Sequence, residues 1–177
     1  MVSPAASERF MASPWMAQMA SASLQAVLNV LVETRAVAGS ALMAQGQPND
    51  HIAFLIEGTA TVSRVAESGR KETLTTLHAP SIFGLTSFFR PQPPGFSVHA
   101  DTSVWVLTLD HHAHDLLRRA DARAAEDLAL LAARVLADRF DLLDQRITAG
   151  MAQHPADHPK ATEWAAFRAR LFDEASS

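Results

Sequence analysis

Residues 46–84, GQPNDHIAFLIEGTATVSRVAESGRKETLTTLHAPSIFG, decide the fold of this 177-residue chain because they form short strands divided by turns. In residues 52–56 and in residues 59–65, two kinds of side chain alternate along the sequence, with the period of two that a strand requires. Gly58 lies between these segments and indicates a bulge or a sharp bend. The pattern therefore predicts two consecutive strands that change direction at this glycine.

A polar segment, residues 66–70, follows the second strand and has the composition of a hairpin tip. Gly69 within it is free to take a positive φ. Residues 72–77, ETLTTL, resume the strand pattern on the other side of the tip. The central unit is predicted to be a hairpin with a neighbouring strand.

The ordered spacing of Gly46, Gly58, Gly69 and the pair Phe83-Gly84 resembles the β-roll of cyclic-nucleotide-binding domains, the sensor half of the catabolite-activator class of bacterial regulators. The resemblance covers roughly residues 24–147. It implies a mainly β fold with α flanks: a double-stranded β-helix, also called a β-roll or jelly roll. N-terminal helices and a long C-terminal helix, the dimer axis in that family, accompany the roll.

Composition limits the classes of protein to be considered. Hydrophobic residues make up 48% of the chain, enough for one domain with a proper core and helical flanks. The formal net charge of -4 gives no overall attraction to nucleic acid or to an anionic membrane surface. Cysteine is absent, which excludes disulfides and thiolate metal sites and fits a cytoplasmic chain. We found no leader pattern and no apolar stretch of membrane-spanning length, so we expect a soluble cytoplasmic protein without a membrane partner.

Four segments are expected: a disordered start followed by helices (1–33), the β-roll (34–110), a short and a long helix (111–150) and a tail helix (151–177). Residues 1–12 are small and polar, which predicts disorder. Ser13-Pro14 resembles a helix start that runs through Met19, and the apolar spacing after Leu24 predicts a second helix that ends near Glu33. The apolar side chains of these helices are predicted to pack, with docking to a partner or a membrane surface as the alternative.

A change to helical periodicity follows a last predicted strand at residues 104–109. A short helix begins at Asp110 or His111 and ends near Arg119, after which Asp121 can cap a long helix that stops at Gly150. The long helix has two apolar stripes, Leu128, Leu131, Val135 and Leu142 in one and Leu136, Phe140, Leu143 and Ile147 in the other. One stripe can cover the roll, and the second is what a homodimer would bury. The alternative is a single wide stripe packed on one core.

The resemblance implies a cyclic-nucleotide cassette in which Phe-Gly is followed by a Glu for the ribose, a short helix whose N–H groups hold the phosphate, and an Arg before Ser or Thr. Phe83-Gly84 matches the start of this cassette. Leu85 occupies the Glu position, and Pro94 and Gly95 occupy the Arg and hydroxyl positions. Loss of two charge-assisted contacts should weaken a nucleotide by about a thousandfold or more.

A non-standard cassette is the alternative that these substitutions leave open. The turn with Thr86 and Ser87 could present N–H donors to an anion, Arg90 is the nearby cation that could replace the missing Arg, and Ser97 is the nearest hydroxyl. The candidate ligand-binding residues are Phe83, Gly84, Leu85, Thr86, Ser87, Arg90 and Ser97. No cofactor is certain, and a cyclic nucleotide is the candidate ligand that the resemblance implies.

A metal-dependent β-roll enzyme of the cupin kind is a further alternative, because the chain has eight histidines. The cupin pattern, His-x-His followed by Glu, is not met by His51 and Glu57. His154 and His158 are separated by Pro155, so they are not expected to share a helical face. We found no Ser-His-Asp, paired-carboxylate or phosphate-loop pattern, so no catalytic residue and no metal are predicted.

These observations predict a non-enzymatic sensory or regulatory module with a degenerate ligand cassette, which acts through dimerisation or a protein partner. The transcription factors that it resembles carry a winged helix-turn-helix after the long helix. Residues 151–177 leave room for one helix, with Trp164, Phe167 and Leu171 on one face, and they are not basic. We therefore expect no direct DNA binding by this chain.

Overall fold

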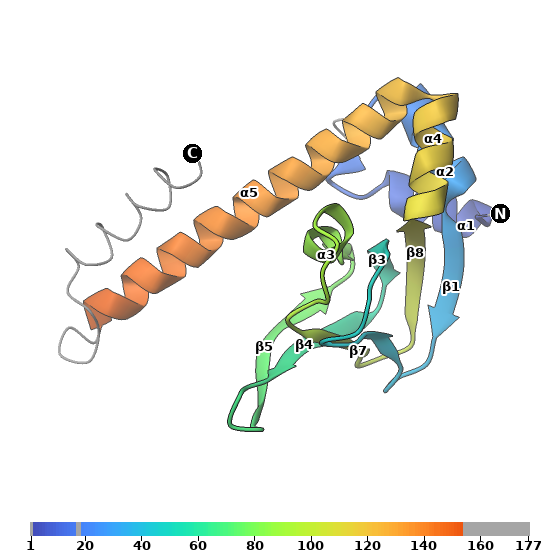
Figure 1. Ribbon diagram of the computed structural model, residues 1–177. Helices are drawn as coiled ribbons and strands as arrows, with labels where there is room; N and C mark the ends of the chain where they lie inside the picture. The colour runs from blue at the N-terminus through green and yellow to red at the C-terminus, as the bar shows by residue number, and fades with distance from the viewer. Residues whose placement is uncertain (1, 17–18, 154–177) are drawn as a thin grey trace. The chain divides into compact units, whose positions relative to one another are not determined.

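The computed structural model describes residues 2–16 and 19–153, with side chains through residue 149. The chain divides into two compact units, Met1–Ala132 and Ala133–Ser177. The described elements follow the order α1 (Pro4–Met11), α2 (Ser21–Val30), β1 (Val32–Ala36), β2 (Ala41–Met43), β3 (His51–Glu57), β4 (Thr59–Val65), β5 (Lys71–His78), β6 (Ser81–Phe83), α3 (Leu85–Phe89), β7 (Ser97–Ala100), β8 (Val104–Asp110), α4 (His111–Ala120) and α5 (Ala122–Gln153) (Figure 1).

Two antiparallel four-stranded sheets form the roll, with strand orders β1-β8-β3-β6 and β2-β7-β4-β5. The chain changes sheets at Gly58, where φ is 88° and the pairing register of β3 shifts. The β4–β5 hairpin closes through Gly69 with φ 79°. The predicted fold, a mainly β jelly roll with flanking helices and a long C-terminal helix, is confirmed.

An apolar cluster fills the space between the two sheets. Its buried members are Met43, Ala53, Leu55, Ala60, Val62, Phe83, Val98, Ala100, Val104 and Val106. Strand β3 is buried on both faces, because its other side chains lie under helix α1, where the Phe10 and Phe54 rings meet edge to face at 5.1 Å. The alternation seen in the sequence of β3 therefore does not produce a solvated face.

The N-terminal predictions need correction. Residues 1–12 were expected to be disordered, but Pro4–Met11 form helix α1 with Ser3 at its N-cap and Phe10 fully buried. Of the helix expected from Pro14 through Met19, residues 14–16 are not α-helical, and residues 17 and 18 lie outside the described residues. Ser13 instead terminates α1, since its N–H donates to the carbonyl of Phe10 and its hydroxyl donates to the carbonyl of Arg9. Burial of one face of α1 against β3 stabilises this helix, a tertiary contribution that the polar composition of residues 1–12 does not reveal.

Helix α2 ends at Val30, before the predicted end near Glu33. Glu33 belongs to β1, whose β-branched residues pair with β8. Its carboxylate accepts hydrogen bonds from the Ser3 amide at 2.7 Å and from Trp105 Nε1 at 2.9 Å. These donors, the Ser3 amide foremost, lower the pKa of Glu33. A carboxylate in β1 thus fixes the start of the chain to the roll.

The helices after β8 begin where the sequence predicts. Asp110 Oδ1 accepts from the Ala113 amide at 2.7 Å at the start of α4, and Asp121 Oδ1 accepts from the Ala124 amide at 3.0 Å before α5. The predicted stop at Gly150 is wrong, because α5 continues to Gln153. A glycine weakens a helix by about 1 kcal/mol relative to alanine, which is too little to end one. The predicted tail helix lies outside the described residues.

Helix α5 is anchored within the first unit by its opening turns. Ala124, Ala125, Leu128, Leu131 and Ala132 are buried, and Ser23 of α2 donates a hydrogen bond to Asp127 Oδ2 at 2.6 Å. Among residues 2–16 and 19–153, no helix combines the length and the apolar character that crossing a membrane requires.

We predict that Gly58→Ala destabilises the protein far more than Gly69→Ala, although both glycines have positive φ. A Cβ at Gly58 would lie 2.5 Å from the Ser103 carbonyl oxygen and 2.8 Å from Thr102 Oγ1, whereas a Cβ at Gly69 meets nothing within 4 Å. Gly69→Ala should cost about 1–2 kcal/mol from the left-handed backbone alone, and Gly58→Ala at least about 2 kcal/mol more. Urea unfolding of both variants measures this, and equal losses would contradict it.

Candidate functional site

The residues that match the start of the cassette form one turn between β6 and α3. Gly84 precedes the five-residue helix α3 with φ 84°. A Cβ at Gly84 would collide with the carbonyl oxygen of His51, so glycine is required both for the backbone conformation and for the close approach to β3. The Phe83-Gly84 pair thus lies between a strand and a short helix, and the structure explains why the second residue is glycine.

The side chains of this turn are mostly directed into the protein. Phe83, Leu85 and Ser87 are buried, and Thr86 is exposed. The Ser87 hydroxyl donates to the Gly84 carbonyl at 3.2 Å and accepts from Asn49 Nδ2 at 2.9 Å. This hydroxyl is thus engaged inside the protein.

Asn49 links the turn to the start of β3, because its Nδ2 also donates to the His51 carbonyl at 2.8 Å. One amide group therefore joins Ser87 of α3 to the backbone of the neighbouring strand. Sequence reasoning did not single out Asn49. A lone asparagine after a proline has the composition of any turn, so the only signal was its position before β3.

The remaining candidate residues lie after α3. Pro94, at the position that the resemblance assigns to an arginine, is buried, and its carbonyl accepts from the Gly46 amide at 2.9 Å. Arg90 is exposed, and its guanidinium has no hydrogen bond or ion pair within the described part of the chain. The Ser97 hydroxyl accepts from the Gln45 amide at 3.0 Å. The structure thus brings Phe83 to Ser87 together in one turn, while Ser97 holds the neighbouring loop.

Helices α3 and α4 meet through a cluster of aromatic and histidine side chains that sequence reasoning missed. The His111 ring stacks on Phe88 with centroids 4.2 Å apart, and His111 Nε2 lies 2.9 Å from the Phe88 carbonyl oxygen. His114 meets the Phe88 ring edge on at 5.6 Å, and burial lowers the pKa of His114. Phe88 therefore connects the cassette helix α3 to α4.

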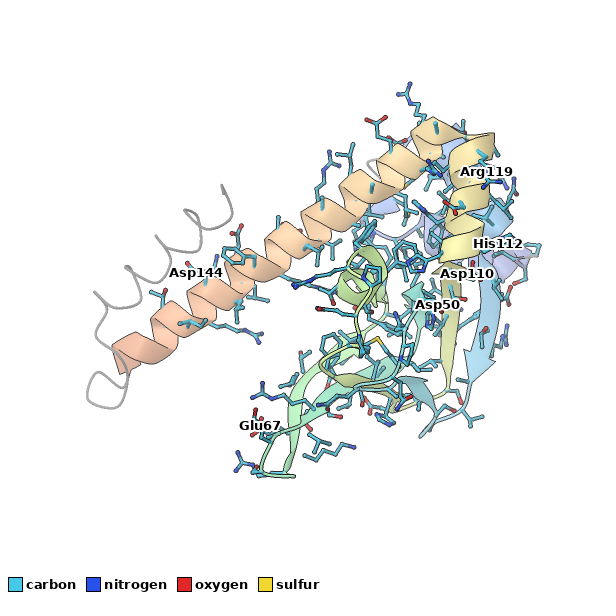
Figure 2. All side chains as sticks on the ribbon, in the orientation of Figure 1. Asp50, Glu67, Asp110, His112, Arg119 and Asp144 are labelled. Atoms are coloured by element: carbon cyan, nitrogen blue, oxygen red, sulfur yellow. The ribbon has the colours of Figure 1, made fainter. Side chains whose placement is uncertain are left out.

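A hollow of about 340 Å³ lies beside this contact. It is lined by Pro48, Asn49, Asp50, Pro91, Gln92, Pro93 and His111. These residues come from the loop before β3, the loop after α3 and the first turn of α4. Figure 2 labels Asp50 near Asp110, at the end of β8 where α4 begins, in agreement with the pairing of His51 with Asp110.

A second hollow of about 300 Å³ lies at the other end of the first sheet and includes Arg35, Glu57 and Trp105 in its lining. The Arg35 guanidinium lies over the Trp105 ring, 3.9 Å from its centroid. Arg9 of α1 forms an ion pair with Glu57 at 3.1 Å. Together with the Glu33 hydrogen bonds, these contacts attach α1 to the roll, which is a structural role.

The residues weighed for a metal-dependent enzyme do not form a ligand set. His51 and Glu57 lie at opposite ends of β3, about 20 Å apart at the rise of a strand. Among the described residues, we found no group of three or more His, Asp or Glu side chains that could hold a metal ion. His154 and His158 lie outside the described residues.

Comparison with known proteins identifies the part of the chain that forms the roll. A family model described as "Cyclic nucleotide-binding domain" matches residues 33–121, which contain the roll from the second residue of β1 onward, and α4. A CRP-like cAMP-activated global transcriptional regulator of Mycobacterium tuberculosis (strain CDC 1551 / Oshkosh) is 32% identical over 75 residues, covering 42% of this chain and 34% of the relative. The match thus spans about one third of the length of that regulator.

Solved structures share the fold at lower sequence identity. The N-terminal domain of a transcriptional regulator from Streptomyces coelicolor A3(2) superposes with a TM-score of 0.64 and 23% identity, covering 76% of this chain and 94% of that one. The Thermus thermophilus catabolite activator protein gives a TM-score of 0.63 and 23% identity, covering 75% of this chain and 62% of that one. The resemblance inferred from the glycine spacing is confirmed.

We predict that folding stability falls as pH decreases below about 6.5, and that His114→Leu reduces this dependence. Because burial lowers the folded-state pKa of His114, the unfolded chain takes up the proton first, and protonation favours unfolding between the two pKa values. Urea unfolding at pH 5.5 and pH 8 measures the difference. His112→Leu, at an exposed neighbouring position, is the control and should leave it unchanged.

Proposed function

Because the chain belongs to the cyclic nucleotide-binding domain family, we propose that it is a non-enzymatic regulatory module whose own cassette no longer supports tight binding of cyclic AMP or cyclic GMP. The regulatory role is inferred from the family to which the chain belongs. The loss of nucleotide binding rests on the side chains of this chain. A cytoplasmic location stays a prediction from composition.

One observation carries the proposal: the two positions that should bear charged groups hold buried apolar residues. Leu85 is 2% exposed, and Pro94 is buried with its carbonyl engaged by Gly46. Neither residue can accept a ribose hydroxyl with a side chain or neutralise a phosphate. Two missing charge-assisted hydrogen bonds correspond to about 3–6 kcal/mol, a loss of more than a hundredfold in affinity.

Arg90 supports a second candidate function, that of a cyclic nucleotide receptor with a non-standard cassette. Arg90 is exposed and follows directly after α3, and its guanidinium has no hydrogen bond or ion pair within the described part of the chain. An arginine can bind a phosphate in bidentate fashion. Against this candidate, Ser87 and Ser97 already have hydrogen-bond partners inside the protein. We therefore retain the degenerate cassette as the main proposal.

The sensory role is proposed to be transmitted through α5. Within its later turns Phe140 and Leu143 of the second predicted stripe are about half exposed, and so is Leu142, the last residue of the first stripe. An exposed apolar stripe on a long helix favours pairing with another helix. We propose that α5 forms a homodimer, with binding to another protein as the alternative. The prediction that the chain does not bind DNA by itself concerns residues beyond 153 and stays a prediction.

We predict no cyclic AMP or cyclic GMP binding by calorimetry at nucleotide concentrations up to about 100 µM. The double variant Leu85→Glu with Pro94→Arg should bind at least about tenfold more tightly than the unaltered protein, because it restores both charged groups. Thr86→Glu with Gln92→Arg adds the same charges at exposed neighbouring positions and serves as the control. A dissociation constant below about 10 µM for the unaltered protein, lost in Arg90→Ala, would establish the second candidate instead.

We predict that the protein is dimeric by light scattering and that Leu142→Asp shifts it to monomers. Each subunit would then have to bury a charge where a leucine contributes about 1.5–3 kcal/mol, which should weaken the dimer at least about tenfold. Ala137→Asp places the same charge at an exposed position outside both predicted stripes and should retain the dimer. A monomer at high concentration would exclude the dimer proposal.

A further inference from the structure

The hollow beside the cassette is the feature that the proposed function leaves unused. It is built by three segments that are far apart in sequence, residues 48–50, residues 91–93 and His111. Its volume of about 340 Å³ lies within the range of small-molecule sites, which begins at about 300 Å³. All of its lining residues belong to the unit Met1–Ala132, so its geometry does not depend on how the two units are placed.

The walls of the hollow are mostly apolar, and the lining residues other than Asn49 are exposed to solvent. Pro48, Pro91 and Pro93 present rigid rings and have no backbone N–H to donate. The His111 ring is held in place by stacking on the buried Phe88 at 4.2 Å. A ligand that enters therefore meets flat apolar surfaces that lose little conformational entropy on binding.

The polar groups around the hollow are mainly acceptors. A carbonyl oxygen only accepts, so the His111 Nε2 that lies 2.9 Å from the Phe88 oxygen carries the proton, and in the neutral ring Nδ1 is an acceptor. Asn49 Nδ2 is occupied by two hydrogen bonds, to His51 and Ser87, which leaves its Oδ1 as an acceptor. The Asp50 carboxylate is 76% exposed at its side chain.

Among the lining residues Asp50 carries the formal charge, which favours a cation; Arg90, which precedes Pro91 in the chain, is not part of the lining. Asp50 has one charged neighbour among the described ion pairs, His51 Nδ1 at 3.3 Å, and that pair is ionic only when the histidine is protonated. The start of α4 offers no anion site, because Asp110 Oδ1 already accepts from the Ala113 amide. Gln92 is the lining residue whose side chain can donate, and it sits on an exposed loop.

We propose that this hollow binds a small organic cation, with its ammonium group on the Asp50 carboxylate and its apolar body against the proline rings and His111. The site extends the proposed function, since it gives the class of effector that a module without a nucleotide cassette would sense. Binding of the cation is independent of the proposed function, and the regulatory meaning of that binding rests on it. Asn49 joins the hollow to Ser87 of α3, and His111 joins it to Phe88 and begins α4. A ligand here contacts α4 directly through His111 and is linked to α3 through Asn49, which donates to Ser87.

Three probes of the same shape and different charge test the site: benzylammonium, benzyl alcohol and benzoate, titrated at pH 8 into the ¹⁵N-labelled full chain. We expect saturable chemical-shift changes for benzylammonium at Asn49, Asp50, Gln92 and His111, weaker ones for benzyl alcohol and none for benzoate. A change at the Ala113 amide, which caps α4 through Asp110, would show that α4 senses the ligand. Equal shifts for the three probes, shifts centred on other residues, or no saturable shift would overturn the assignment.

Two variants locate the binding. Asp50→Asn should weaken benzylammonium about twofold to fivefold, as expected for a largely exposed charge pair. Glu67→Gln removes the same charge at the tip of the β4–β5 hairpin and should have no effect (Figure 2). Gln92→Trp, at an exposed position, should fill the hollow and abolish binding without unfolding the roll. Unchanged affinity in both Asp50→Asn and Gln92→Trp would refute the site.

Cyclic AMP added as a fourth probe separates this inference from the proposed function. Shifts at Leu85 and Thr86 with tight cyclic AMP binding would refute the degenerate cassette, while benzylammonium shifts at the hollow would still establish the new site. If neither benzylammonium nor cyclic AMP causes saturable chemical-shift changes, the hollow is refuted as a binding site and the proposed function is left intact.

Discussion

Strand β3 is buried on both faces, and the arrangement of the described elements depends on this. Ala53 and Leu55 face the apolar cluster between the sheets, while Phe54 lies under Phe10 of α1. A strand in this position has hydrogen-bonded neighbours on both edges, β6 and β8, so its backbone groups need no water. The turn after β6 approaches the His51 carbonyl so closely that only glycine fits at position 84. Burial of one strand thus fixes both the N-terminal helix and the cassette turn.

Local signals predicted the roll well, because its turns need residues with special backbone conformations. Gly58, Gly69 and Gly84 all have positive φ, and their spacing gave the resemblance that the family match confirms. Helix α1 could not be predicted in the same way. Its sequence, PAASERFM, has weak amphipathic character, and it is held by a single buried phenylalanine, by the Ser3–Glu33 hydrogen bond and by the Arg9–Glu57 ion pair. These contacts join residues about 30 to 50 positions apart, which local periodicity does not detect.

The candidate site shows the same contrast. Counting positions from the family pattern located Leu85 and Pro94, and the structure finds both side chains buried. The hollow was not predictable, since Asp50, Pro93 and His111 become neighbours only when three loops meet at the end of β3 and β8. Eight histidines suggested metal binding in the sequence, whereas in the structure two of them pack around Phe88. Composition identified the residue type but gave no information on its partners.

The apolar cassette has a physical consequence for how such a module can work. A glutamate at position 85 would be buried, and an unpaired buried carboxylate costs several kcal/mol until a ligand supplies a donor. Leucine removes that cost, so the turn is stable without a nucleotide. Ser87 is likewise satisfied by Asn49 and the Gly84 carbonyl. The buried side chains of the turn, Leu85 and Ser87, therefore leave no unmet polar group for a nucleotide to satisfy. The stacking of His111 on Phe88 joins a residue that lines the hollow and begins α4 to the cassette helix α3, so a ligand in the hollow would act on α4 through this side chain.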